Sequence, residues 1–291
     1  MENKAWTDHP EDTIRQRIEA FVAESPENRM AQLDGAPFFD APLVGFADGD
    51  DPLFSQFKMI IGPSHLTPRE WLAGQPNAPH ASLERLSVIG YILPITEETR
   101  VSNRAETRQP SLRWAHQRTH GEEFNKLVRR FIVDLLRKAG YLAIAPMDSE
   151  RWQAFYEAQP GHNAKPPFSN WSERHAQFVA GLGTFSVNDG LITPRGIAHR
   201  CGSVITNLPL EPTPRDYSGP YDHCLLLAKG TCGVCIDRCP AGAISEAGHD
   251  KERCRAYMAN DIAHLREDWG LAVPGCGLCQ TGVPCEYGIP E

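Results

Sequence analysis

Three segments of the chain carry hydrophobic residues at regular spacing. In residues 121–138, apolar side chains recur at steps of three and one, which places them on one face of an amphipathic helix. Residues 11–24 follow the same helical spacing, and Pro10 suits the first turn of a helix. Residues 86–95 are largely apolar and flanked by charged residues. This last run predicts a buried strand.

Weaker local signals complete a coarse map of this half of the chain. Thr67 and Glu70 have the spacing of a capping box, so a short helix is predicted to begin there. Residues 96–110 are polar and charged, which predicts a surface loop. Further strands are predicted over 141–145 and 201–208, and a further helix from Ser169 or Asn170 toward Gly181.

Composition narrows the classes of protein to consider. The 291 residues include 29 basic and 37 acidic side chains, a net charge of −8, and 41% hydrophobic residues, enough for a substantial core. The negative charge and the lack of a Lys/Arg run make nucleic acid or a membrane surface an unlikely partner. The sequence has no apolar stretch of roughly 18 residues and no signal-peptide pattern at its start. We therefore expect a cytoplasmic protein without a membrane segment.

Cysteine placement is the most informative feature of the sequence. Of nine cysteines, only Cys201 precedes residue 224. In a reducing compartment such crowding favours metal binding over disulfides. The Pro-rich stretch 210–220 marks a change of composition, so two domains are predicted. They are an α/β cofactor- and substrate-binding domain over 1–215 and a small cysteine-rich domain over 216–291. Cys201 itself is expected to be a buried spectator.

The spacing of the cysteines matches that of iron-sulfur proteins. Cys232, Cys235 and Cys239 before Pro240 reproduce the last three cysteines of the bacterial ferredoxin run, and Cys224 replaces the first. Eight thiolates suffice for two 4Fe-4S clusters. The crossed ferredoxin pattern predicts one cluster on Cys224, Cys232, Cys235 and Cys285, and the other on Cys239, Cys254, Cys276 and Cys279. A pair of structural zinc sites is the alternative, although the Cys-Pro tail is typical of ferredoxins.

Three segments before the cysteines resemble a known family. AGLG at 180–183, LITP at 191–194 and VITNLPL at 204–210, followed by the cysteine run, are similar to the epoxyqueuosine reductase and reductive dehalogenase superfamily. The resemblance implies an α+β protein, in which a nitroreductase-like α/β domain holds cobalamin with its lower axial base detached. A small domain like bacterial ferredoxin, with two clusters, would follow. The expected cofactor-binding residues are Gly181, Gly183, Thr184, Leu191, Ile192 and Thr193.

The resemblance also suggests a proton donor. Epoxyqueuosine reductases carry an Asp-Tyr-His-Lys stretch at the start of a helix, and Glu123 takes the place of its aspartate here. A carboxyl group beside an apolar corrin face would have a raised pKa. The alternative is that Glu123 only favours a helix N-terminus electrostatically. Additional candidates for ligand contact, with surface charge or packing as the default explanation, are Arg113, Arg118, Arg174, Trp114 and Trp171.

The resemblance implies that electrons from a low-potential ferredoxin or flavodoxin pass through the two clusters to a base-off cobalamin. The cobalamin would then reduce a small organic substrate. Two other interpretations remain open. The chain could be a ferredoxin-type electron carrier or a reductive activator of a corrinoid protein, without turnover of its own. A flavin could also fill the N-terminal pocket.

Overall fold

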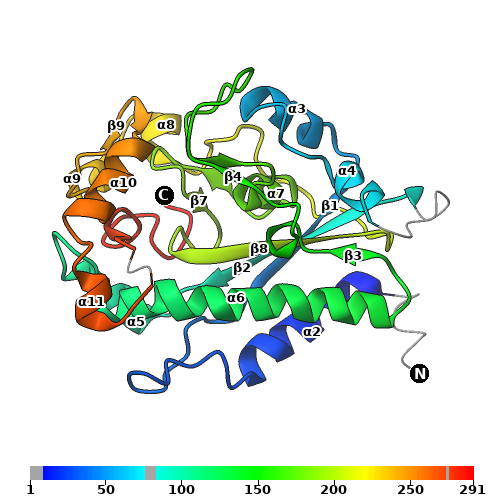
Figure 1. Cartoon of the computed structure of the whole chain (residues 1–291), viewed down its shortest axis with the longest axis horizontal. Coiled ribbons are helices and arrows are strands. Elements are labelled where there is room, and N and C mark those ends of the chain that lie inside the picture. The colour runs from blue at the N-terminus through cyan, green and yellow to red at the C-terminus, as the bar shows by residue number, and fades with distance from the viewer. Residues whose placement is uncertain (1–8, 76–82, 273–274) are drawn as a thin grey trace.

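The structure is a computed structural model that describes residues 9–75, 83–272 and 275–291 (Figure 1). A four-stranded sheet runs through the middle of the molecule. Helices cover both of its faces, and the cysteine-rich segment lies at one end. The fold is therefore α+β, as the sequence predicts.

The sheet is antiparallel throughout. Its strands are β1 (Leu43–Asp48), β2 (Ser87–Pro94), β8 (His199–Thr206) and β3 (Ala143–Ile144), in that spatial order. Every residue of β2 is buried, as predicted from its apolar run. The three predicted strands are confirmed, although β3 is shorter than its signal. The antiparallel order shows that the alternation of strands and helices along the sequence does not produce parallel crossovers here.

Two helices cover one face of the sheet. Helix α2 (Pro10–Glu24) packs on α6 (Leu112–Lys138), and Phe21 of α2 stacks on Phe131 of α6 with ring centroids 4.3 Å apart. Helix α6 begins nine residues before the predicted start, because Ser111 caps it by accepting a hydrogen bond from the Trp114 amide at 3.1 Å. The early start matters, because the added turns face the cysteine-rich segment.

Three shorter helices cover the other face. They are α3 (Pro52–Ile60), α4 (Pro68–Ala73) and α7 (Glu173–Val179). The capping box predicted for α4 is present, with both reciprocal hydrogen bonds. Helix α7 begins later than predicted, after Ser172. Trp71 and Trp171, both fully buried, fill the space between these helices and the sheet.

The loop predicted over 96–110 is wrong in its first half. Residues Glu97–Arg104 form helix α5, with two acidic residues in the first turn and Arg104 in the last. Its buried side chains are polar: Thr99 bonds Thr96 at 3.1 Å, and Asn103 accepts from the Ser111 amide at 2.9 Å. A helix that buries hydrogen-bonded polar groups has no apolar period, so a hydrophobicity pattern does not reveal it.

Short elements make up the rest of the described chain. In the middle region they are η2 (Pro146–Asp148), β4 (Ala154–Phe155), β5 (Phe168–Ser169), β6 (Thr184–Phe185) and β7 (Leu191–Ile192). In the cysteine-rich region they are α8 (Leu225–Lys229), α9 (Val234–Asp237), β9 (Ile244–Ser245), β10 (Gly248–His249), α10 (Lys251–Asn260), α11 (Leu265–Trp269) and η3 (Leu278–Gln280).

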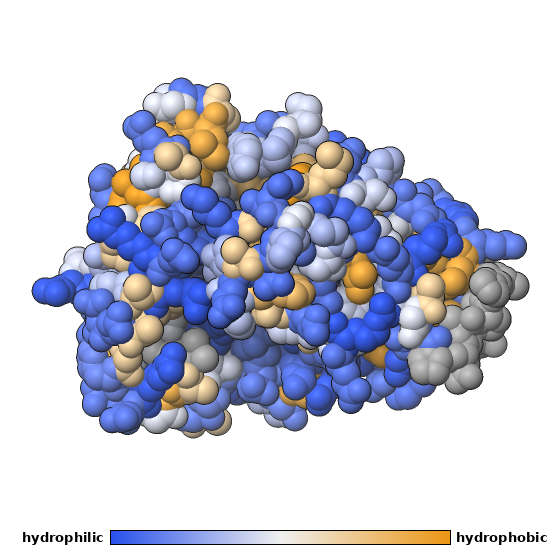
Figure 2. Space-filling model, turned by 45° about the horizontal axis from the view of Figure 1, so that its top comes forward, coloured by the Kyte–Doolittle hydropathy of each residue, from blue (hydrophilic) through white to orange (hydrophobic). Residues whose placement is uncertain are grey.

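The cysteine-rich region shares a core with the segment before it. Val187, Ile192 and Ile197 from the β6–β8 region pack in one apolar cluster with Ile244 and Val283. Buried contacts thus cross the domain boundary predicted near residue 215. The boundary stays a prediction. In the described part of the chain, no helix is long and apolar enough to cross a bilayer. Figure 2 shows a largely hydrophilic face with apolar residues in small separate patches.

A buried carboxylate ties the C-terminal segment to α5. The side chain of Glu286 is only 2% exposed, and it accepts from Arg104 at 2.7 Å and from Arg100 at 3.3 Å. The Gly282 amide donates to its other oxygen at 2.7 Å. The C-terminal segment is thus held to α5 by charged hydrogen bonds rather than by apolar packing alone.

We expect Glu286→Gln to destabilise the protein by about 2 to 3 kcal/mol, because it leaves two guanidinium groups without their carboxylate. Thermal unfolding of the variant should show a fall in Tm of at least ~4 °C. Arg85→Gln is the control, since Arg85 and Glu211 form an exposed pair at 3.4 Å that contributes little. Equal Tm values for the two variants would contradict the prediction.

Candidate functional site

Four cysteines line a small cavity at the edge of the cysteine-rich region. They are Cys224, Cys232, Cys235 and Cys285. Burial raises the pKa of the Cys285 thiol, and with the added effect of the neighbouring Cys235, Cys224 and Cys232 it reaches about 12. The four sulfurs are therefore close enough to act on one another electrostatically. We call this set the outer quartet.

The other four cysteines line a second, larger cavity. They are Cys239, Cys254, Cys276 and Cys279, which we call the inner quartet. Burial raises the pKa of Cys279, as do its three quartet partners and, more weakly, Cys235 of the outer quartet. The structure thus brings together the two sets that the ferredoxin spacing predicts, and it places them side by side. Within the described ranges, no three His, Cys, Asp or Glu side chains are grouped to hold a single metal ion.

The larger cavity has a volume of about 580 Å³ and reaches from the inner quartet to the sheet and to α6 and α7. The loop around Cys276 lies directly against α6. Gly275 and Gly277 both have positive φ, 61° and 66°. A Cβ on Gly275 would lie 2.7 Å from Cγ of Arg118, and one on Gly277 would lie 2.1 Å from the Trp114 ring. Only glycine allows this approach, which brings the inner quartet and α6 to one cavity.

A buried carboxyl group lines the same cavity. Neither carboxylate oxygen of Glu173, the first residue of α7, is exposed to solvent, and neither has a hydrogen-bond partner of good geometry. Burial raises the pKa of Glu173 to about 7, although Arg129 and the nearby Ser203 hydroxyl lower it. Glu173 is therefore a carboxyl group that changes protonation state near neutral pH.

Arg129 lowers the pKa of Glu173 electrostatically and forms ion pairs with two other carboxylates. Its guanidinium donates to Asp148 at 3.0 and 3.1 Å and to Glu122 at 3.3 Å, and only 3% of its side chain is exposed. Glu122 also pairs with Arg200 of β8 at 3.7 Å. Helix α6 thus supplies both an acidic and a basic group to the cavity wall.

The predicted proton donor lies outside both cysteine cavities. Glu123 is exposed on α6 and lines neither cysteine cavity, whereas Glu122, one position earlier, lines the larger one. Successive helical residues point about 100° apart, so the one-residue difference moves the carboxylate from the solvent face to the cavity face.

Four of the six predicted cofactor-binding residues lie outside the two cysteine cavities. Leu191 lines the larger cavity and Ile192 the small one. Gly181, Gly183, Thr184 and Thr193 line neither. Thr184 accepts from the His223 amide at 2.9 Å, and Thr193 donates to the Gly196 carbonyl at 2.9 Å. These residues shape the β6–β7 hairpin, which carries Leu191 and Ile192 to the two cavities.

The five additional candidates for ligand contact lie in two different places. Arg118, Arg174, Trp114 and Trp171 line the larger cavity, while Arg113 forms surface pairs with Asp34 and Glu98 at 2.6 and 2.9 Å. Cys201 also lines this cavity, and burial raises its pKa to about 12. The roles of Glu173, Glu122 and Arg200 at the cavity were missed. The sequence around a charged residue does not show whether its side chain is buried, whether the residue lies in a helix or on a strand.

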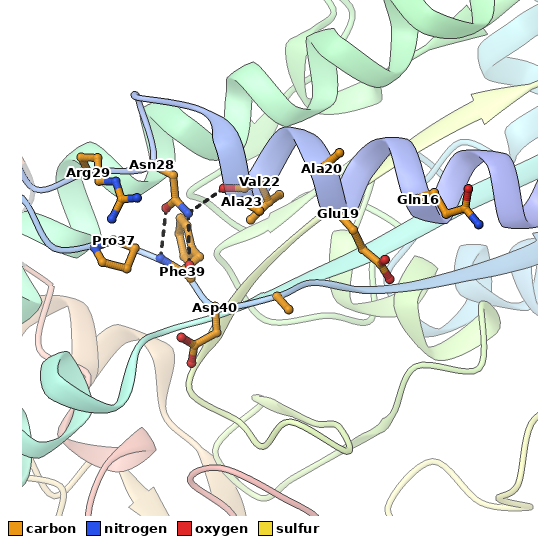
Figure 3. Close-up of a pocket in the computed structure, with 11 residues that line it drawn as sticks. Gln16, Glu19, Ala20, Val22, Ala23, Asn28, Arg29, Pro37, Phe39 and Asp40 are labelled. Carbon is orange, nitrogen blue, oxygen red and sulfur yellow. Dashed lines mark hydrogen bonds between the residues drawn. The ribbon is translucent and has the colours of Figure 1, made fainter.

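A third hollow, of about 500 Å³, lies between α2 and residues 37–41 (Figure 3). Its central polar side chain is Asn28, which donates to the carbonyls of Val22 and Phe39 at 3.0 and 3.1 Å and accepts from the Phe39 amide at 3.1 Å. Asn28 thus uses its hydrogen-bonding groups to hold the chain together, and we assign the hollow no function.

Part of the chain is similar in sequence to known reductases. No protein-family model matches it. An epoxyqueuosine reductase from Bacillus anthracis is 34% identical over 124 residues, which are 40% of this chain and 30% of that protein. A trichloroethene reductive dehalogenase from Dehalococcoides mccartyi is 32% identical over 149 residues, 42% of this chain and 26% of that protein. The chain is a relative of the epoxyqueuosine reductase and reductive dehalogenase superfamily. It matches less than a third of the length of each of these relatives.

Solved structures of the superfamily are similar over most of this chain. An epoxyqueuosine reductase from Bacillus subtilis has a TM-score of 0.47 at 19% identity and covers 86% of this chain and 62% of its own. A reductive dehalogenase, whose structure was described as suggesting a mechanism for B12-dependent dehalogenation, has a TM-score of 0.49 at 18% identity. That match covers 85% of this chain and 30% of the dehalogenase.

We expect Gly277→Ala to destabilise the protein more than Gly230→Ala. Both glycines are left-handed, with φ of 66° and 68°, so both variants incur about 1 to 2 kcal/mol of backbone strain. Only the Cβ at residue 277 collides with Trp114, whereas the position at Gly230 is open. The collision adds about 1 to 3 kcal/mol. Thermal unfolding should show the larger fall in Tm for Gly277→Ala, and equal falls would contradict the close approach.

Proposed function

We propose that this chain is an iron-sulfur reductase that uses cobalamin to reduce a small organic substrate. One observation carries the proposal: the inner quartet lines the same cavity as Glu173, a buried carboxyl group with a pKa near neutrality. A reductive site requires a route for electrons and a source of protons at one place. Here the two lie on the walls of one cavity.

The cysteine side chains fit two clusters. The outer quartet would hold one and the inner quartet the other, each with the four thiolates that a 4Fe-4S cluster takes. When bound, the clusters supply single electrons and the cobalamin supplies a strongly reducing cobalt centre. The influence of Cys235 on the pKa of Cys279 indicates that the quartets are near neighbours. Electrons are then proposed to enter at the outer quartet and leave at the inner one.

The larger cavity also suits a ligand rich in amide groups. Buried polar atoms without a hydrogen-bond partner occur on four described residues that line it: Gln117 Nε2, Trp152 Nε1, His199 Nδ1 and both carboxylate oxygens of Glu173. Such atoms are costly unless a ligand or water pairs with them. A corrinoid carries amide donors and acceptors around its rim. It is larger than the cavity and would extend through the partly open side.

Glu173 is the proposed proton donor. Its carboxyl group is shielded from water, and the same burial that raises its pKa keeps a proton available near pH 7. Arg129 acts in the opposite direction and keeps the pKa from rising further. Trp171 donates to Ser203 at 3.0 Å, which positions the hydroxyl next to Glu173. These groups orient the acid and exclude water around it.

The electron donor is proposed to dock beside the outer quartet. Tyr221, Leu227 and Ile289 are exposed apolar residues near its cavity, at 47%, 41% and 39% exposure. Leu226 and Pro290 line that cavity, and Leu227 and Ile289 are their direct neighbours in sequence, while Tyr221 precedes Cys224 by three residues. A low-potential ferredoxin or flavodoxin remains the predicted donor, and nucleic acid remains an unlikely partner.

We expect Glu173→Gln to lower the turnover rate by about 10²- to 10⁴-fold, because it removes a positioned acid. In the unaltered protein, turnover should fall as the pH rises through about 7, where Glu173 loses its proton. The variant should lose this pH dependence. Glu123→Gln is the matched control, since that carboxylate is exposed on α6. A pH profile unchanged in Glu173→Gln would exclude Glu173 as the donor.

Metal analysis tests the proposed function directly. Anaerobic reconstitution with hydroxocobalamin should give about eight iron atoms per chain, four for each cluster, together with one cobalt and a base-off visible spectrum. Cys279→Ala should lose about half the iron, whereas Cys201→Ala should keep it all. Eight iron atoms without cobalt would overturn the reductase and favour an electron carrier or an activator of another corrinoid protein.

A further inference from the structure

The larger cavity carries an excess of positive charge. Among the described residues that line it, six are Lys or Arg and three are Asp or Glu. One of those three acids, Glu173, is half protonated near pH 7. This is unusual in a protein whose net charge is −8. The surplus is therefore concentrated at this site rather than shared with the whole surface.

Three arginines account for most of the surplus. Arg118 comes from α6, Arg174 from α7 and Arg200 from β8, and we call them the arginine face. Burial, the nearby Arg118 and, more weakly, Arg174 together lower the pKa of Arg200 to about 9. Burial and Arg174 likewise lower the pKa of Arg118. The three guanidinium groups thus lie close enough to repel one another.

The acids around the arginine face are engaged elsewhere. Glu122 lies 3.7 Å from Arg200 but is shared with Arg129 at 3.3 Å. Asp189 pairs with His249 at 3.2 Å and with Lys251 at 3.8 Å. In the described part of the chain, no carboxylate forms an ion pair with Arg118 or Arg174. Arg118 is partly buried without a carboxylate, which is costly, and a ligand anion would remove that cost.

We propose that the arginine face binds the carboxylate, or an equivalent small oxyanion, of the substrate. Three guanidinium groups from separate elements offer planar pairs of donors that match two carboxylate oxygens. Glu173 precedes Arg174 in α7, so the acid lies next to the proposed anion site. Trp114 and Trp171 add aromatic walls to the same cavity. The proposal rests on the proposed function for its reaction and names the class of substrate: small organic acids with an aromatic or apolar body.

Two other anions compete for this explanation. The inner quartet with its cluster carries negative charge, and Arg118 lies against Gly275 beside Cys276. The nucleotide tail of cobalamin carries a phosphate. Either one could neutralise the arginine face without any substrate anion. The test must therefore measure anion binding with the clusters, and then the cobalamin, already in place.

Equilibrium dialysis with radiolabelled benzoate, and with benzamide as its neutral counterpart, distinguishes a substrate anion from the inner cluster or the cobalamin phosphate as the partner of the arginine face. The cluster-loaded protein should bind benzoate at least ~10-fold more tightly than benzamide, since charge-assisted hydrogen bonds of this kind are worth about 1.4 kcal/mol or more. Cobalamin loading should leave this preference intact. Equal affinity for the two probes, or loss of benzoate binding once clusters or cobalamin are present, would overturn the proposal.

Variants assign the binding to the arginine face. Arg200→Gln and Arg174→Gln should each weaken benzoate binding about 10-fold and leave benzamide binding unchanged. Arg174 is exposed at the cavity mouth, so its variant should fold even if Arg200→Gln does not. Arg195→Gln is the matched control, because Arg195 pairs with Asp40 at 3.8 Å and lines neither cysteine cavity. Unchanged benzoate affinity in Arg174→Gln would overturn the proposal. Because cobalt content is measured separately, failure to bind cobalamin is distinguishable from failure to bind the anion.

Discussion

The close approach of the loop around Cys276 to α6 is the contact on which the site depends. At Gly275 and Gly277 a side chain would collide with Arg118 or Trp114, so the backbone itself touches the helix. This contact closes the larger cavity on one side and brings four thiols to its wall. Because α6 begins at Ser111, its first turns reach the loop.

Glu173 and Arg200, two charged groups of the cavity, are buried from water, and this burial shifts their pKa values. Burial raises the pKa of Glu173 and lowers that of Arg200, so both charged forms are less favoured than in water. Arg129, paired with Asp148 and Glu122, stabilises the charged form of Glu173 and limits the shift. The cavity therefore holds an acid near its midpoint of titration beside Arg118 and Arg174, with which no carboxylate of the described residues forms an ion pair. Both features favour a ligand that brings negative charge and accepts a proton.

The sequence predicted those features that depend on local spacing. The apolar run of β2, the capping box of α4 and the helical face of α6 were recognisable because each is encoded within a few turns or one strand. The fold family was likewise recognisable, because its segments occur in a fixed order before the cysteines. Ferredoxin spacing also predicted which cysteines lie together, although Cys285 is far from its partners in sequence.

What the sequence did not predict depends on three-dimensional environment. Helix α5 buries polar groups, so its pattern resembled a loop. Glu122 and Glu123 are chemically identical, and only the rotation of α6 decides which one faces the cavity. The hairpin glycines and threonines hold the turn, while Leu191 and Ile192 project from it to the two cavities. Motif matching identifies the segment that builds a site, but not which of its residues reach the site.

The order of the parts across the molecule limits how a reaction here would proceed. The outer quartet lies beside exposed apolar residues, the inner quartet lines the larger cavity, and the acid and the arginine face lie on the walls that α6, α7 and β8 contribute. In the proposed reaction, electrons would enter from the side of the outer quartet, while Glu173 stays shielded from water. An anionic substrate would be held away from the similarly charged clusters by the arginines between α6 and α7. Separating the electron entry from the proton source in this way favours reduction of the bound substrate over reduction of solvent protons.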